Sequence, residues 1–482
     1  MYSIYLYLVA YKLLLKVMYP SEFTKRLLSQ EYIDSESLIN SLNEPAPISF
    51  RINPFKWNYE PLDATKVSWA ENGYFIEKRP SFTLDPLFHS GCYYPQEASS
   101  MFIEQVFKQL VDEKKQLRIL DLCAAPGGKS THLSTLIGNE GVLIANEVIR
   151  SRASILMETL TKWGIGNVLV TQNDPSAFSC LEGYFDVILV DAPCSGEGMF
   201  RDEVARNNWS EMNANLCSER QKRILSDIWQ SLKENGLLIY CTCTFNPSEN
   251  EKIVEWLVEN RPAEIVLLDI NRFPAITPID CNGVKGYSFL PYKTKGDGFF
   301  LSVLRKKEEV KPVKMKNVKV TESKPTDKEK DLIKNLSLIS EDRLLKNANE
   351  IWALPCDYNE YNLLNQSLKI IKHGVKLATI KQNDIIPSHD LALSTDMLKS
   401  EFHEIELGYG DAISFLKRDS LNIPTSKRGW IILKYKGINL GWAKNIGTRI
   451  NNYYPVDWRI RMNVANADKS NIIKWKYGNI TD

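Results

Sequence analysis

The sequence predicts an α/β protein built around a parallel, doubly wound sheet, and three observations carry this prediction. Short apolar runs alternate with helical stretches between about residue 117 and residue 305. Most of these runs end in an acidic residue or a cysteine. A turn rich in glycine and alanine joins the first run to a helix. Because buried parallel strands are continuously apolar and are joined by helices, the pattern favours a sheet covered on both faces.

Seven apolar runs are predicted to form strands: LRILDL, GVLIANE, NVLVTQND, FDVILVD, GLLIYCTC, AEIVLLD and GFFLSVLR. Two of the segments between them, RSRASILMETLTKWG and SERQKRILSDIWQSLKENG, have helical character. In such sheets, ligands bind beyond the carboxyl ends of the strands. We therefore expect a site at that edge, where the acidic residues, Cys241 and Cys243 fall.

The chain of 482 residues is too long for one ordinary core and predicts several domains. Lys-rich residues 307–330 read as a solvated linker. The predicted division is an extension over 1–17, an N-terminal α+β segment over 18–105, the sheet domain over 106–306, the linker over 307–330 and a β-rich domain over 331–482.

Composition narrows the class of protein. The net charge of +1 shows no global field for nucleic acid, so any basic surface must be local. Nine irregularly spaced cysteines are typical of reduced thiols and favour a cytoplasmic location. The apolar N-terminus is interrupted by Lys12 and Lys16, which argues against a membrane span or a signal peptide, and Met18 is an alternative start. We expect a monomer.

The segment LDLCAAPGGKS, Leu120 to Ser130, reads as a strand, a tight loop and a helix start. Small residues there let backbone amides approach a ligand closely. Neither phosphate-binding glycine spacing is present, and the simplest alternative is a plain strand-to-helix turn. Glu147, at the end of the second run, is placed to accept from a ribose diol. Asp174 is placed either to accept from an adenine amine or to hold its loop. Together these favour S-adenosylmethionine over NAD.

Two loops carry cysteines at neighbouring strand ends. VDAPCSGEGMFRD places Cys194 after the fourth run, and YCTCTFNPSENE places Cys241 and Cys243 after the fifth. Buried filler, a zinc site with a fourth ligand, and a reactive thiolate compete as explanations. No C-x-x-C pair or histidine spacing supports a metal. Ser248 and Glu251 resemble a capping box, whose helix would favour a thiolate at Cys243 if its positive end faced that residue.

These motifs resemble the NOL1/NOP2/Sun family of RNA cytosine-C5 methyltransferases. The resemblance rests on LDLCAAPGGKS, ANE, QND, VDAPCSGEGMFRD and YCTCTFNPSENE, with PISFRINPFK, YYPQEASSMF and KGDGFFLSVLRK beside them, and it covers about residues 18–306. The segments IIPSHDLALS, LGWAKN and NNYYP resemble the bacterial RsmF-like branch. This implies a Rossmann-like class I S-adenosylmethionine-dependent methyltransferase sheet, a C-terminal PUA-like RNA-binding domain and small-subunit (16S) ribosomal RNA as substrate.

The resemblance also implies roles for individual residues. Cys243 would be the nucleophile, and Cys194 would assist release of the product. Cys241, where the family usually has serine, is interpreted as a packing variant. The residues implied to line the methyl-donor site are Cys123, Ala124, Ala125, Pro126, Gly127, Gly128, Lys129, Glu147, Asp174 and Asp191.

The proposed chemistry explains why two cysteines are present. A thiolate that adds to C6 of cytosine makes C5 nucleophilic, and Asp191 can stabilise the charge that develops near N3 and N4. DNA cytosine methyltransferases use a Pro-Cys cysteine for attack, which would point to Cys194 instead. The target base must be unpaired or turned out of its stack.

Residues expected to hold RNA are Arg51, Tyr93, Tyr94, Arg201 and Arg206, and NNYYP with Arg459 and Arg461 either contacts RNA or forms a core strand. Transfer RNA is the alternative substrate. A methyltransferase acting on protein or small molecules, and a non-catalytic RNA-binding ribosome assembly factor, are the alternatives of other classes.

Overall fold

The computed structural model describes residues 19–112, 116–281, 283–311, 323–337, 339–382, 384–398, 402–462 and 471–476. Two sequence predictions lie outside these residues. The N-terminal extension, with its alternative start at Met18, is one of them, and the middle of the predicted linker, residues 312–322, is the other.

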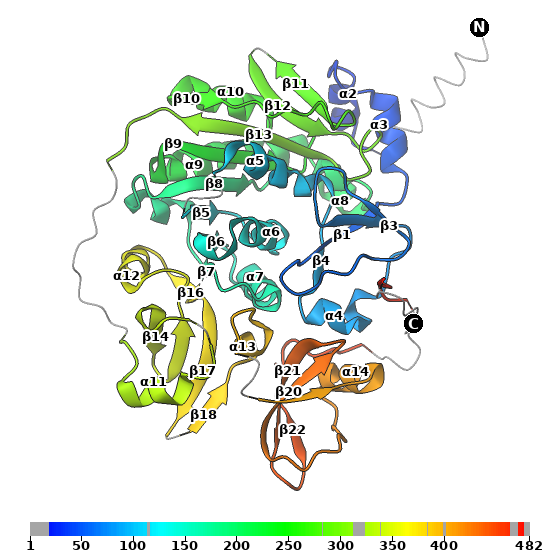
Figure 1. Ribbon diagram of the computed structural model, residues 1–482. Helices are drawn as coiled ribbons and strands as arrows, with labels where there is room; N and C mark the ends of the chain where they lie inside the picture. The colour runs from blue at the N-terminus through cyan, green and yellow to red at the C-terminus, as the bar shows by residue number, and fades with distance from the viewer. Residues whose placement is uncertain are drawn as a thin grey trace.

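A ten-stranded mixed sheet forms the centre of the molecule (Figure 1). Its parallel part consists of β5 (Arg118–Asp121), β6 (Val142–Asn146), β7 (Val168–Thr171), β8 (Phe185–Asp191) and β9 (Leu232–Thr242). The strand order across this part is β9-β8-β5-β6-β7. The first five predicted strands are therefore confirmed, and all end at one edge.

Antiparallel strands extend the sheet at both sides and correct the expectation of a purely parallel sheet. They are β10 (Ala263–Ile265), β11 (Thr277–Cys281), β12 (Val284–Phe289), β13 (Phe299–Lys306) and β16 (Ile370–Lys372). β13 pairs with β9, whereas β16 comes from the C-terminal part and pairs with β7. The predicted run AEIVLLD is a strand only at its start, because β10 pairs with β13 through three residues and the chain then leaves the sheet.

Helices cover both faces of the sheet because successive strand residues point to opposite sides. Ile119 of β5 packs in one core with helices α5 (Ile103–Leu110), α6 (Gly128–Ile137) and α7 (Arg150–Trp163). Its neighbour Leu120 packs in a second core with α9 (Glu211–Ile228), α10 (Glu251–Asn260) and α12 (Tyr358–Ser367). The two cores give the three-layered arrangement expected of a doubly wound fold.

The N-terminal segment packs against the carboxyl edge of the sheet and one of its sides. Helices α2 (Ser21–Leu27) and α3 (Ser35–Leu42) pack on the chain near Phe200 and Phe245. A four-stranded sheet follows in the order β2-β3-β1-β4, formed by β1 (Ile48–Ile52), β2 (Ala64–Lys66), β3 (Gly73–Ile76) and β4 (Tyr93–Pro95), and a short helix α4 (Pro86–His89) precedes β4.

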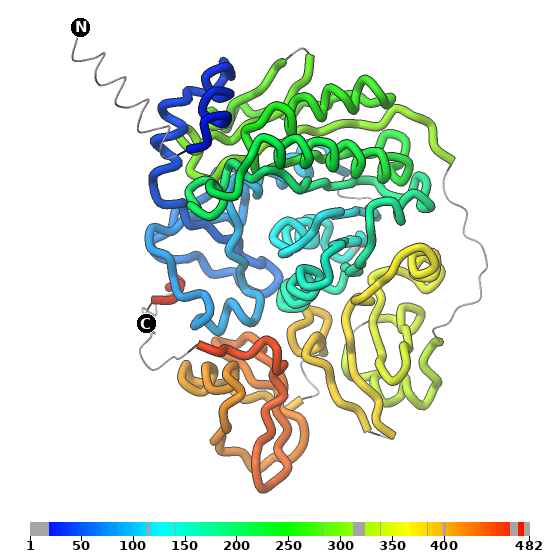
Figure 2. Tube along the Cα trace, turned by 180° about the vertical axis from the view of Figure 1, so that it is seen from behind, coloured from blue at the N-terminus to red at the C-terminus, as the bar shows by residue number. Residues whose placement is uncertain are grey.

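The C-terminal part contains two small sheets, and its chain, yellow and orange in Figure 2, lies at the bottom of that view. The first has the order β14-β15-β17-β18, with β14 (Leu344–Asn347), β15 (Glu350–Ala353), β17 (Val375–Lys381), β18 (Asp384–Pro387) and helices α11 (Asp327–Ile333) and α13 (His389–Leu393). The second has the order β19-β20-β21-β22, with β19 (His403–Glu406), β20 (Gly429–Tyr435), β21 (Ile438–Asn445), β22 (Ile450–Asn452) and helix α14 (Tyr409–Lys417).

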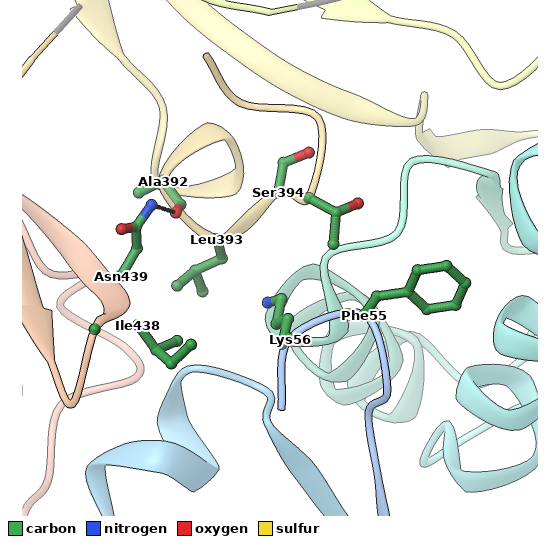
Figure 3. A pocket seen from close by; sticks show the side chains of 9 residues that line it. Phe55, Lys56, Ala392, Leu393, Ser394, Ile438 and Asn439 are labelled. Carbon is green, nitrogen blue, oxygen red and sulfur yellow. Dashed lines mark hydrogen bonds between the residues drawn. The ribbon is translucent and has the colours of Figure 1, made fainter. Parts of the chain in front are cut away.

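The end of α7 joins all three parts of the chain. The Thr395 amide donates to the Gly164 carbonyl at 2.9 Å, and the Lys56 ammonium donates to the Lys162 carbonyl at 2.6 Å. A pocket of about 100 Å³ lies here, and Figure 3 shows Lys56, Leu393 and Asn439 around it. None of the predicted site residues lines this pocket. Among the described residues, no helix combines the length and apolar character that crossing a membrane requires.

Candidate active site

The loop between β5 and α6 folds back over the ends of its neighbouring strands. The Leu122 amide donates to the Leu189 carbonyl of β8 at 3.0 Å, and the Ala124 amide donates to the Asn146 carbonyl of β6 at 2.9 Å. Gly127 has φ of +116°, and a Cβ there would meet Thr159 at 2.8 Å. Only glycine fits this turn without strain, so the small residues of the motif place the loop against the strand ends.

A cavity of about 170 Å³ opens beside this loop. The predicted residues that line it are Cys123, Ala124, Ala125, Pro126, Gly128, Lys129 and Asp191, and further lining residues are Tyr94, Pro95, Gln96, Glu97, Ser100 and Asp121. Segments before β5 therefore contribute one wall, which the strand-end pattern did not indicate. Gly127, Glu147 and Asp174 are not among the lining residues.

Glu147 and Asp174 lie in different surroundings. Glu147 follows β6, is 3% exposed, accepts from the Ile149 amide at 2.9 Å and faces Arg152 at 3.4 Å. Asp174 caps a short 3₁₀ turn by accepting from the Ser176 amide at 3.2 Å, and its side chain is 47% exposed. Of the two roles predicted for Asp174, the structure shows the one that holds the loop.

Asp121 lies buried at the floor of the cavity. Its Oδ2 accepts from the Ser130 hydroxyl at 2.7 Å, whereas Oδ1 has no partner among the described residues. Burial raises the pKa of this carboxyl to about 7, and the nearby Asp191 and Glu147 carboxylates act in the same direction. A buried acceptor without a donor is costly, so Asp121 is suited to a ligand that brings one.

Lys129 and Asp191 form an ion pair across the cavity. Nζ of Lys129 donates to Oδ2 of Asp191 at 2.7 Å. Burial alone would lower the pKa of Lys129, but the Asp191 carboxylate and the nearby Cys241 outweigh it and raise this pKa above its usual value. The ammonium therefore stays charged and holds the orientation of the Asp191 carboxylate.

The side chains of the two predicted reactive cysteines are in direct contact. The Sγ atoms of Cys194 and Cys243 are 3.2 Å apart, and the Cys243 amide donates to the Cys194 sulfur at 3.4 Å. Both residues are partly exposed, and both follow strands that end beside Asp191. The loops also approach closely, because a Cβ on Gly198 would meet the Cys243 carbonyl at 2.9 Å.

Cys194, Cys241 and Cys243 lie in different surroundings. The hydrogen bond with Cys243, together with burial, raises the pKa of Cys194 well above its usual value. A protonated Cys194 can donate to the Cys243 sulfur, and such a donor stabilises a thiolate. Cys241 is fully buried, and burial followed by the Asp191 charge raises the pKa of its thiol well above normal. Cys241 is therefore a buried, protonated thiol, and it donates to Oδ1 of Asp191 at 3.6 Å.

The expected capping box is wrong. Helix α10 begins at Glu251, its N-cap is Asn250, and no side chain among the described residues caps it. Glu251 instead accepts from the Tyr32 hydroxyl at 2.6 Å. Because the helix starts eight residues after Cys243, the sequence-based reason for a helix dipole at this thiol does not hold. The group that the structure places against the Cys243 sulfur is the Cys194 thiol.

Two of the expected RNA contacts are buried. Arg51 is 1% exposed, donates to the Gln96 side chain at 2.9 Å and lies 4.5 Å from the ring of Trp163. Tyr93 is 1% exposed and donates to Asp85. These two side chains hold the interior together, which contradicts the prediction that they contact RNA.

The other residues expected to contact RNA lie in different surroundings. Tyr94 lines the cavity beside the β5–α6 loop. Arg201 pairs with Asp297, and Arg206 lies 5.2 Å from the ring of Tyr19. In the NNYYP motif, Tyr454 is buried, whereas Tyr453 is exposed. Arg459 and Arg461 are exposed too.

Three residues that sequence reasoning missed connect the cysteine loops. Arg26 of α2 pairs with Glu197 at 2.6 Å and also donates to the Phe245 carbonyl at 3.2 Å. Glu249 accepts from the Ser195 amide at 2.8 Å. The only sequence signal for Glu197 and Glu249 was their position inside the two cysteine motifs. Arg26 had no such signal. No group of three or more metal-ligating side chains with suitable geometry occurs within the described ranges.

Comparison with known proteins connects this geometry to a family. Family models match the chain in three places: an N-terminal domain of 16S rRNA methyltransferase RsmF over residues 19–98, a 16S rRNA methyltransferase RsmB/F over 108–305 and a methyltransferase RsmF PUA domain over 402–460. The PUA match confirms the predicted class of the β-rich C-terminal end.

Full-length relatives agree with the family models. The ribosomal RNA small subunit methyltransferase F of Enterobacter sp. (strain 638) is 30% identical and covers 91% of this chain and 95% of its own length. Its Aeromonas hydrophila counterpart is 31% identical over 84% and 86% of the two chains. A solved methyltransferase homolog from Pyrococcus horikoshii has 28% identity and a TM-score of 0.52 over 61% of this chain and 97% of its own. The chain therefore belongs to the ribosomal RNA small subunit methyltransferase F family.

Proposed function

We propose that this methyltransferase transfers a methyl group from S-adenosylmethionine to C5 of a cytosine in small-subunit ribosomal RNA, through a transient bond between the Cys243 sulfur and C6. The observation that carries the proposal is the pair of sulfur atoms 3.2 Å apart, beside Asp191 and the adjoining cavity. A methyltransferase that acts on protein or small molecules has no need for two opposed thiols at this place.

The residues around the cavity fit the methyl donor. Asp121 offers a buried acceptor without a partner, and Glu147 at the end of β6 is the carboxylate placed for a ribose diol. The small residues of the β5–α6 loop leave backbone amides accessible, as a donor with an amino acid end and a nucleoside end requires. Asp174 would hold the loop beside this site, as its bond to Ser176 suggests.

The first step is attack on the base. The Cys243 thiolate forms a carbon–sulfur bond at C6, and the electron pair of the C5–C6 double bond moves toward C5. Cys194 stabilises the thiolate beforehand by donating its S–H, and Asp191 stabilises charge that develops at the polar edge of the ring. S-adenosylmethionine, when bound, would supply an electrophilic methyl group to C5, and its sulfur would keep the electron pair of the broken carbon–sulfur bond and leave as a neutral thioether.

The second step restores the aromatic ring. The C5 proton leaves to a base, its electron pair rebuilds the C5–C6 double bond, and the carbon–sulfur bond breaks to return the Cys243 thiolate. Cys194 supports this release because its S–H stands next to the leaving sulfur and stabilises the thiolate as it re-forms. The two thiols thus act on the same sulfur atom at the beginning and the end.

Ribosomal RNA is favoured as the substrate by the names of the full-length relatives and by the matched PUA domain. The exposed Tyr453, Arg459 and Arg461 on that domain are suited to contact a polyanion with unstacked bases. Transfer RNA is the second candidate, because the chemistry at the thiols does not distinguish the two RNAs. We further propose that the protein is a monomer. Its N-terminal, methyltransferase and C-terminal domains would span residues 18–105, 106–306 and 331–482.

Labelled methyl donor, mixed with separated ribosomal and transfer RNA, tests the proposal. We expect label in small-subunit RNA, recovered as 5-methylcytidine after digestion, and none with the Cys243→Ala variant. Label in another nucleoside or in protein would contradict the proposed reaction. Label confined to transfer RNA would contradict the proposed substrate but not the chemistry. Bisulfite sequencing of RNA from a deletion strain would then locate the modified base.

A further inference from the structure

The two cysteine loops are joined by buried contacts in both directions. Glu249, from the loop after Cys243, accepts from the Ser195 amide at 2.8 Å and from the Ser195 hydroxyl at 2.5 Å. Ser195 directly follows Cys194 in the other loop. A two-point bond to one residue fixes that residue's backbone and side chain together, so Glu249 limits where Cys194 can lie.

The return contact comes from Glu197 in the Cys194 loop. Its carboxylate accepts from the Phe245 amide at 3.2 Å, and the Gly198 amide donates to the Cys243 carbonyl at 2.9 Å. Both carboxylates, Glu197 and Glu249, are fully buried. The loops are therefore linked by hydrogen bonds in both directions, at residues near Cys194 and Cys243 in the chain.

The two carboxylates differ in charge compensation. Glu197 has Arg26 at 2.6 Å. Glu249 has no cation within ion-pair distance among the described residues, and its partners are the neutral groups of Ser195, Thr244 and Gln221. Burial raises the pKa of Glu249 to about 7, with Glu197 contributing in the same direction. An uncompensated buried carboxylate lowers stability, so its presence is better explained by its effect on the Cys194 loop.

We propose that Glu249 is a positioning residue that holds Cys194 against Cys243 and thereby serves the release step. The inference rests on the proposed function for the assignment of that step, but not for the geometry. Loss of Glu249 would free Ser195 and let the Cys194 sulfur move away. Attack by Cys243 would continue, whereas release would slow, since a displacement of about 1 Å slows a positioned reaction by on the order of 10²-fold.

The variants are chosen to separate positioning from general destabilisation. Glu249→Gln keeps an oxygen that accepts from the Ser195 amide, whereas Glu249→Ala leaves no side-chain acceptor for Ser195 at this position. Glu360→Gln is the control for a change at a buried carboxylate elsewhere: Glu360 accepts from the Tyr184 hydroxyl at 2.6 Å, although unlike Glu249 it also pairs with a cation, Arg118, and it lies on α12, away from the thiols.

The first readout measures geometry without RNA. Hydrogen peroxide converts two thiols into one disulfide and is reduced to water, and the rate at which the Cys194–Cys243 peptide pair forms reports how closely the sulfurs meet. We expect Glu249→Ala to slow this rate by about tenfold or more, while Glu249→Gln and Glu360→Gln stay near wild type.

The second readout measures release. With RNA and methyl donor, Glu249→Ala should accumulate a covalent protein–RNA adduct that the wild type and Glu360→Gln do not, and Glu249→Gln should restore release. Unchanged disulfide and adduct levels in Glu249→Ala would overturn the inference. A slower disulfide rate in Glu249→Ala, combined with no adduct in this variant and none in Cys194→Ala, would leave the positioning role standing and contradict the covalent mechanism instead.

Discussion

The two halves of the active site are built in different ways. The wall of the proposed methyl-donor cavity that carries Cys123 to Lys129 is one continuous segment, shaped by a turn at Gly127 and by backbone hydrogen bonds to neighbouring strand ends. The thiol half consists of α2 and of the loops that carry Cys194 and Cys243, and these segments lie far apart in the chain. The comparison teaches that the donor half depends on local backbone shape, whereas the thiol half depends on a few long-range side-chain bonds.

The largest expected effect tests the chemical centre of the thiol half. Cys243→Ala should reduce methyl transfer by more than about 10³-fold, because the attacking sulfur is lost. Cys241→Ser, which keeps a small donor beside Asp191, serves as the control and should retain most activity. The measurement is methyl transfer from labelled donor to small-subunit RNA. Substantial activity of Cys243→Ala would contradict the role of Cys243 as the attacking residue.

The second effect concerns the bonds that assemble the thiol half. Arg26→Met should lower the free energy of unfolding by about 3 kcal/mol, because the fully buried Glu197 carboxylate loses its cation. Adding Glu197→Gln should recover part of this loss, since the buried charge is removed as well. Denaturant unfolding of the two single variants and the double variant measures the coupling. Simple additivity of the two losses would contradict the role given to this pair.

Much of the donor half could be predicted from sequence because its information is contiguous. The five parallel strands and the loop from Cys123 follow from apolar runs and small residues a few positions apart. The contact of Arg26 with Glu197 spans 171 residues, and that of Glu249 with Ser195 spans 54. No local pattern marks such partners. The same reason explains Arg51, whose burial against Trp163 depends on a helix far along the chain.

Three of the antiparallel strands, β11, β12 and β16, were missed for a related reason, whereas the predicted run GFFLSVLR is confirmed as β13. The hairpin of β11 and β12 pairs with β13, and β16 reaches the other edge from the C-terminal part. A three-residue strand such as Ile370–Lys372 has too few residues to show a period, and its pairing is decided by packing of the segment that carries it. The start of α10 was misplaced because Glu251 bonds with Tyr32 instead of closing a capping box.

A smaller effect is expected at the bond between the two halves. Lys129→Met should slow methyl transfer by about tenfold, because one charge-assisted hydrogen bond orients the Asp191 carboxylate. Lys129→Arg should recover part of the rate by restoring a cation. The ratio kcat/KM for RNA, measured at saturating donor, checks this expectation. Equal rates for the methionine and arginine variants would show that the charge has no role.

The last expected effect is a pH dependence in the donor half, measured as the slope of stability against pH. The pKa of Asp121 is raised from 3.8 to about 7, so the folded state keeps a proton that the unfolded state has lost between these values. The free energy of unfolding should therefore fall as pH rises through this window, by at most about 1.4 kcal/mol per pH unit for one proton. Asp121→Asn should show a shallower decline over the same window. An unchanged slope in unfolding experiments from pH 4 to about pH 7 would contradict the buried state of this carboxyl.

The covalent bond at Cys243 is tested most directly by mapping the adduct in a variant that cannot release it. Cys194→Ala, incubated with small-subunit RNA and methyl donor, should accumulate a protein–RNA complex that survives denaturation. After digestion, mass spectrometry should find a methylated cytidine on the peptide that contains Cys243. A nucleotide attached to any other residue, or Cys194→Ala turning over normally without an adduct, would contradict the account.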